Sequence, residues 1–120
     1  MTESLPDDVA DVLEFALNTD EPVHIALRRQ VPHLSVRSRC TCGCGTAHFE
    51  LDTSEVEPAQ TGSGTVMAAD VQLFTENGEC PGEVLVFAQS GYLSWLEVCS
   101  WSDEVEVNLV AARRWLRPPS

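Results

Sequence analysis

Lysine is absent from this chain, and positive charge is scarce altogether. Seven arginines stand against 19 acidic residues over 120 positions, which gives a formal net charge of −12. Between Cys40 and Ala112 there is no basic residue. Because a negative field repels phosphate backbones and anionic lipid headgroups, this composition argues against direct binding to nucleic acid or to a membrane.

The acidity suits a protein partner with a basic surface, because complementary potentials accelerate the encounter of two proteins. The alternative is that the acidity only keeps a small protein soluble. The absence of lysine is itself typical of a high-GC genome, in which lysine codons are scarce. It therefore indicates a bacterial source and says nothing about function.

Long apolar runs are missing as well. No stretch approaches the roughly 20 residues that a membrane-spanning helix needs. The acidic residues 1–8 lack the basic-then-apolar pattern of a signal peptide. We therefore expect a soluble, cytoplasmic protein. With 43% hydrophobic and 22% charged residues, a chain of this length supports one core, so residues 1–120 are predicted to form a single domain.

Apolar residues at helical spacing predict two helices near the N-terminus. The first has Ser4 as a candidate N-cap and Pro6 in its first turn, and it ends at residues 18–20. The second begins one or two residues before Pro22 and ends at Pro32. Their predicted buried stripes are Val9, Val12, Leu13, Ala16 and Leu17 in the first helix, and Val23, Ala26, Leu27 and Val31 in the second.

After the second helix the hydrophobic period changes to two, which predicts strands. The expected strands span residues 34–39, 46–52, 66–75, 84–89 and 92–101. The alternation places His48 outward in the second strand. In the third strand it places Met67, Val71 and Leu73 on one side.

The last two strands form the clearest hairpin, which the dipeptide Ser90-Gly91 closes. Its two-residue turn predicts three opposed pairs: Ala88 with Leu93, Val86 with Trp95, and Val84 with Glu97. Both faces are largely apolar, so we expect cover on both sides. With a short C-terminal helix in residues 108–116, the pattern predicts an α+β fold, in which two N-terminal helices pack on an antiparallel sheet of about five strands.

Three of the five cysteines lie close together in the cysteine segment, residues 40–45. An odd count without an export signal argues against a disulfide framework. As thiolates, Cys40, Cys42 and Cys44 can hold Zn²⁺, with His48 as the nearest fourth ligand. The spacing is not the common Cys-x2-Cys knuckle. Thiols that only fill a tight turn, or that act in redox chemistry, therefore stay open as alternatives.

Outside this segment few residues indicate chemistry. Cys80, Cys99 and His33 are further candidates for the fourth ligand, and both cysteines are otherwise expected to be structural. Glu97 is a candidate acid or base among aromatic neighbours, or else a carboxylate at a sheet margin. The chain has no phosphate loop, dinucleotide fingerprint or His-Glu-x-x-His motif. We therefore expect no enzymatic activity, with a thiol- or metal-dependent enzyme as the alternative.

Two longer stretches of the chain carry a resemblance. They are Val31-Pro-His-Leu-Ser-Val-Arg-Ser-Arg-Cys-Thr-Cys-Gly-Cys-Gly-Thr and Gly91-Tyr-Leu-Ser-Trp-Leu-Glu-Val. In this order they resemble an uncharacterised family of small bacterial proteins, which has an Arg-Cys-x-Cys-Gly-Cys segment followed by a Gly-x-Leu-Ser-x-Leu-Glu-Val strand. The resemblance spans residues 27–102 and implies a shared small α+β domain. It brings no activity, cofactor or catalytic residue.

Together these features predict a small acidic protein that acts by binding another protein, with a zinc ion at the cysteine segment as its candidate cofactor. Size, charge and fold class also fit an immunity protein that neutralises a basic toxin, which is a second alternative. The oligomeric state and the identity of the partner stay open.

Overall fold

The computed structural model describes residues 5–39, 46–74, 77–80 and 82–100 of the chain. This part of the chain contains two helices followed by five strands, which confirms the predicted α+β class. The elements are α1 (Asp7–Ala16), α2 (Pro22–Gln30), a 3-10 turn (Val31–His33), β1 (Leu34–Arg39), β2 (Ala47–Leu51), β3 (Thr65–Leu73), β4 (Gly82–Gln89) and β5 (Tyr92–Ser100). The predicted helix in residues 108–116 lies outside the described residues.

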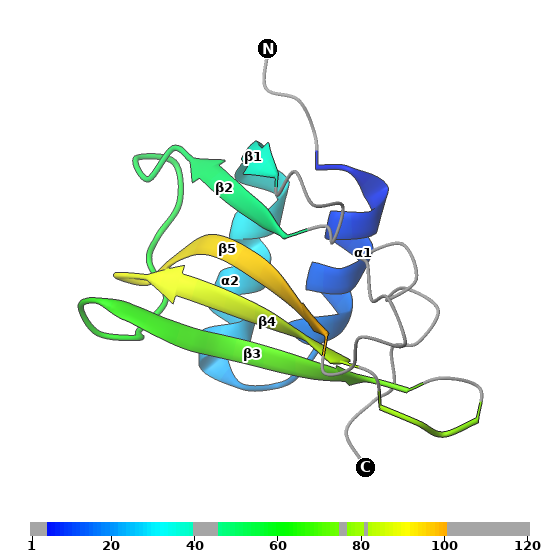
Figure 1. Ribbon diagram of the computed structural model, residues 1–120. Helices are drawn as coiled ribbons and strands as arrows, with labels where there is room; N and C mark the ends of the chain where they lie inside the picture. The colour runs from blue at the N-terminus through cyan, green and yellow to red at the C-terminus, as the bar shows by residue number, and fades with distance from the viewer. Residues whose placement is uncertain (1–4, 40–45, 75–76, 81, 101–120) are drawn as a thin grey trace.

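All five strands form one antiparallel sheet in the order β1-β2-β5-β4-β3, so β5 is central and β3 lies at an edge. Both helices lie on the same face of this sheet (Figure 1). The buried side chains of the helices and of the facing strand positions form one hydrophobic core. Among the described residues, no helix is long and apolar enough to cross a membrane.

The first helix buries the stripe that its spacing predicts. Val9, Val12 and Leu13 are fully buried, and Leu17 at its C-cap is buried with them. The prediction for Pro6 is wrong by one position, because this residue precedes the helix in an extended conformation. Its carbonyl accepts the N–H of Ala10 at 3.0 Å and so begins the helical hydrogen bonding. The predicted cap Ser4 lies outside the described residues.

The second helix begins at Pro22, one or two residues later than predicted, and its end and its buried face also differ from expectation. The chain continues through Pro32 as a 3-10 turn, since a proline in the first turn needs no N–H partner. Leu27 is fully buried, whereas Val23 is half-buried. The other fully buried residue of the helix is a glutamine, Gln30, which the hydrophobic pattern did not predict.

Gln30 is buried because its amide serves three backbone groups. Its Nε2 donates to the carbonyls of Glu57 at 3.1 Å and Gly91 at 2.9 Å. Its Oε1 accepts the N–H of Leu93 at 2.9 Å. The side chain therefore joins the end of α2 to the loop before β3 and to the start of β5, and it provides the buried N–H of Leu93 with an acceptor.

The hairpin of β4 and β5 contains a bulge that changes its predicted register. Ala88 lies opposite Leu93 as expected, but Phe87 pairs with Trp95, which leaves Ser94 without a partner in the register. Beyond the bulge the predicted pairs are wrong by one residue. Val86 lies opposite Leu96 and Val84 lies opposite Val98. The extra residue turns Leu96 and Val98 toward the helices, where they are buried, and turns Trp95 and Glu97 to the other face.

A second bulge, in β3, places Met67 on the opposite face from Val71 and Leu73, with which it was predicted to lie. This residue pairs with Phe87 and Ala69 pairs with Val86, so Ala68 is the extra residue. Val71 and Leu73 point into the core as predicted, but Met67 is 54% exposed on the opposite face. The bulge thus divides β3 into two parts that present different faces.

Candidate functional site

The cysteine segment lies outside the described residues, so its predicted zinc ligands Cys40, Cys42 and Cys44 stay a prediction. The fourth candidate, His48, lies on β2 and points outward as expected, between the buried Ala47 and Phe49. Within the described part of the chain, no group of three or more histidine, cysteine, aspartate or glutamate side chains is arranged to hold a metal ion.

His48 instead belongs to a row of side chains across the outer face, the sheet face opposite α1 and α2. Its ring stacks on Trp95 with 6.1 Å between centroids. Trp95 in turn stacks on Phe87 at 4.4 Å and 13° between planes. Met67 continues the row on β3, opposite Phe87. Four strands thus contribute to one band of aromatic and thioether surface.

Carboxylates follow this row along the same face. Asp70 on β3 and Glu97 on β5 both lie opposite Leu85, and Glu83 lies opposite Gln72. Partial burial, and then the charge of Asp70, raise the pKa of Glu83 above its ordinary value. Glu97 accepts a long hydrogen bond from the thiol of Cys99 at 3.8 Å. The face is therefore apolar in one band and negatively charged in the next.

Cover for the hairpin is found on one side among the described residues, where both helices pack against the inner face. The expected cover on the outer face stays a prediction. On that face Phe87 and Trp95 are half-buried, and β3, β4 and β5 contain no lysine or arginine.

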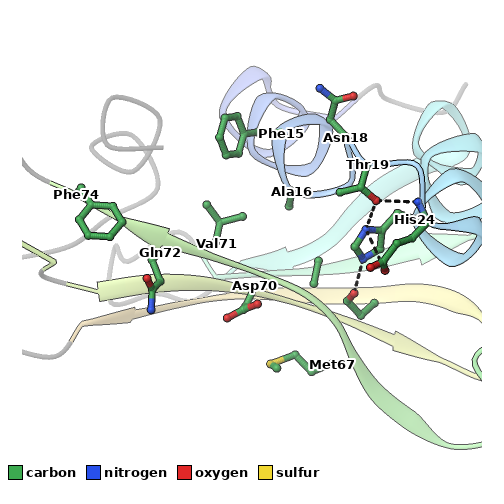
Figure 2. A pocket seen from close by; sticks show the side chains of 13 residues that line it. Phe15, Ala16, Asn18, Thr19, His24, Met67, Asp70, Val71, Gln72 and Phe74 are labelled. Carbon is green, nitrogen blue, oxygen red and sulfur yellow. Dashed lines mark hydrogen bonds and ion pairs between the residues drawn. The ribbon is translucent and has the colours of Figure 1, made fainter. Parts of the chain in front are cut away.

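A groove of about 580 Å³ runs beside the edge strand β3. One wall is β3 itself, from residue 67 to 72 together with Phe74, and the other is the end of α1 with the turn into α2. Figure 2 shows Phe15, Val71 and Phe74 on the helix side of β3, whereas Met67 and Asp70 lie on the other side of the strand. The groove thus combines an apolar interior with a polar rim.

One end of the groove is formed by a histidine that sequence reasoning did not single out. The Nε2 of His24 lies 2.7 Å from the carbonyl of Ala68, and its Nδ1 lies 2.7 Å from the Thr19 hydroxyl. Because a carbonyl oxygen only accepts, Nε2 carries the proton and a neutral ring receives the Thr19 hydroxyl hydrogen at Nδ1. The carboxylate of Glu21 lies 3.8 Å from the same nitrogen.

This arrangement fastens the start of α2 to the bulge of β3, since Ala68 is the extra residue there. The Thr19 oxygen also accepts the N–H of Glu21 at 3.2 Å, so both polar side chains are occupied within the protein. No sequence signal identifies His24 in advance, because its partner is 44 positions away.

The remaining candidates are not brought together. His33 lies near Glu55, with 3.6 Å between Nδ1 and the carboxylate oxygen. The thiol of Cys80 contacts the carbonyl of Gly82 at 3.5 Å, next to the start of β4. These contacts agree with structural or surface roles, and neither forms a constellation for catalysis.

No protein-family model, no curated protein and no solved structure matches this chain. The groove and the outer face are therefore the features of the molecule from which a function can be inferred.

Proposed function

We propose that this protein is a non-enzymatic binding module that recognises a protein partner with a basic surface, and that the outer face of the sheet is its recognition surface. Such a surface needs apolar or aromatic area that a partner can cover. It also needs charges that select one partner over another. Both properties occur on the outer face.

The observation that carries the proposal is the composition of β3, β4 and β5. These adjacent strands present the stacked rings of Phe87 and Trp95 beside three carboxylates, without a lysine or arginine. An arginine side chain can stack on an aromatic ring while it pairs with a carboxylate. Burial and then the charge of Asp70 raise the pKa of Glu83, and a cationic partner would relieve the second of these effects.

The proposal is tested by selecting a displayed library of random peptides on the immobilised protein. We expect the enriched peptides to contain arginine and lysine in excess over the starting library, and their binding to weaken as salt is added. Binding of the enriched peptides is then compared between two variants with the same change in net charge. E83Q/E97Q removes two carboxylates of the outer face, and E55Q/E57Q removes two from the loop before β3.

The proposal requires that E83Q/E97Q weaken binding about tenfold while E55Q/E57Q binds like the wild type. Enrichment without an excess of basic residues would show that charge does not select the partner. Equal losses in both variants would show that net charge matters but that the outer face does not.

A further inference from the structure

We infer that the basic partner contributes an extended segment, which adds a strand to the free edge of β3 and alternates apolar with basic residues. This inference rests on the proposed function, and it adds the binding mode and the sequence pattern of the partner. It follows from three features of the groove: an unpaired backbone edge, an apolar interior and an acidic outer rim.

The first feature is the backbone edge. Among the described strands, β3 is the last in the sheet order and pairs on one side only, with β4. On its other side, one hydrogen bond reaches the strand from the described residues. His24 donates it to the carbonyl of Ala68. Unpaired N–H and C=O groups on an edge strand form a template for another extended chain.

The two parts of β3 differ in how far they can serve as that template. The bulge at Ala68 and the ring of His24 obstruct the first part, which is a common way to protect a sheet edge. From Ala69 to Leu73 the pairing with β4 is regular and nothing among the described residues bonds to the free edge. At about 3.4 Å per residue, this part accepts a segment of about five residues.

The second feature is the groove interior, which continues the core beyond β3. Phe15 and Phe74 border it together with Val71, whose side chain packs into the core. A strand added to β3 would direct every second side chain into this space. Those positions should be apolar and of moderate size.

The third feature is the charge on the outer side. The alternate side chains of the added strand would lie on the outer face, next to Asp70 and Gln72 of β3. The carboxylate of Asp70 lies on this outer side, and the described residues that line the groove include no lysine or arginine. The outward positions of the partner segment should therefore be basic.

The probe for this inference is a synthetic alternating peptide, Val-Arg-Val-Arg-Val-Arg, compared with its isomer Val-Val-Val-Arg-Arg-Arg. The two peptides have the same composition and charge and differ only in the order of their residues. We expect the isomer to bind about tenfold more weakly, because it lacks the alternation. Because the amides of a strand point alternately to its two sides, N-methylation of one alternate set should weaken binding about tenfold and methylation of the other set should not. Hydrogen exchange should slow at amides of residues 69–73 when the peptide saturates the protein.

Variants of the protein locate the charge contribution. D70N removes the carboxylate at the rim of the groove. The control, E50Q, removes an exposed carboxylate on β2, and β5 and β4 lie between that strand and β3. We expect D70N to weaken the alternating peptide about threefold to tenfold and E50Q to leave it unchanged.

The outcomes separate this inference from the proposed function. If both peptides bind equally and slow exchange elsewhere on the sheet, the added strand is wrong while recognition of a basic partner stands. If neither peptide binds and the library selection also enriches no basic sequence, both are wrong. If exchange at residues 69–73 already depends on protein concentration without peptide, a second copy occupies the edge and the inference is overturned.

Discussion

Replacing Gln30 by leucine tests whether one buried amide joins the helices to the sheet. Leucine has nearly the same volume, so Q30L removes the hydrogen bonds while it leaves the core filled. The N–H of Leu93 loses its partner inside the protein, which costs about 1–3 kcal/mol for a buried donor. The carbonyls of Glu57 and Gly91 each lose a donor, at about 1 kcal/mol apiece.

The sum, about 3–5 kcal/mol, is a large share of the roughly 5–15 kcal/mol that stabilises a typical domain. The loss at Gly91 is moderated because its oxygen also accepts the N–H of Ala59 at 2.8 Å. Urea unfolding measures the effect as a lower midpoint at an unchanged slope. The matched control is Q89L, which replaces an exposed glutamine at the end of β4. It should change stability by less than about 0.5 kcal/mol.

A second substitution at the same position separates lost hydrogen bonds from other causes. The carboxylate of Q30E accepts the Leu93 N–H but repels the carbonyls of Glu57 and Gly91, so this variant should be less stable than Q30L at pH 7. It should recover in acid, because a protonated carboxyl donates again. If the free energy of unfolding of Q30L lies within about 1 kcal/mol of the wild-type value, the hydrogen bonds of this amide do not hold the helices to the sheet.

Three further outcomes follow from single features of the fold. Burial and Asp70 raise the folded-state pKa of Glu83, so the ionised carboxylate lowers the free energy of unfolding above that pKa. E83Q should therefore be more stable than the wild type at pH 7. Unfolding measured as a function of pH should show this advantage vanish as the pH falls below the ordinary pKa of 4.5. Gly91 has φ +89°, and a Cβ there would lie 2.7 Å from Pro58 Cβ, whereas Gly78 has φ +83° in open space. Thermal unfolding should therefore show that G91A loses about 2–4 kcal/mol of stability and G78A about 1 kcal/mol. Native mass spectrometry without chelators should find zinc released by thiol alkylation if the cysteine segment binds metal, and its absence would leave turn filling and redox chemistry as the alternatives for those thiols.

The sequence predicts the elements of this fold well because each depends on local pattern. The stripe from Val9 to Leu17 is buried as its period indicates, and the alternation in residues 47–51 buries Ala47 and Phe49 and half-buries Leu51. The start of α2 is predicted to within two residues, because the fixed φ of Pro22 suits the first turn of a helix. These signals need no knowledge of what lies across the core.

The sequence does not predict the features that depend on distant partners. Gln30 is polar at a position of the buried helix face, and only backbone groups 27 to 63 residues away, at Glu57, Gly91 and Leu93, make its burial favourable. His24 likewise becomes informative only beside Ala68. A hydrophobic pattern assigns such residues to the surface, because the hydrogen bonds that compensate for burial are not local.

The bulges show why the candidate site was harder to predict than the fold. One inserted residue inverts every side chain beyond it, so an uninterrupted alternation assigns the wrong face to the residues on one side of each bulge. With the uninterrupted register, Trp95 would oppose Val86, which is buried under the helices. The bulge at Ser94 places Trp95 against Phe87 and His48, and the bulge at Ala68 adds Met67 to the same row. The outer face on which the proposed function depends is thus a product of two insertions in the ladder, and deleting Ser94 should disperse the row while it leaves the helices in place.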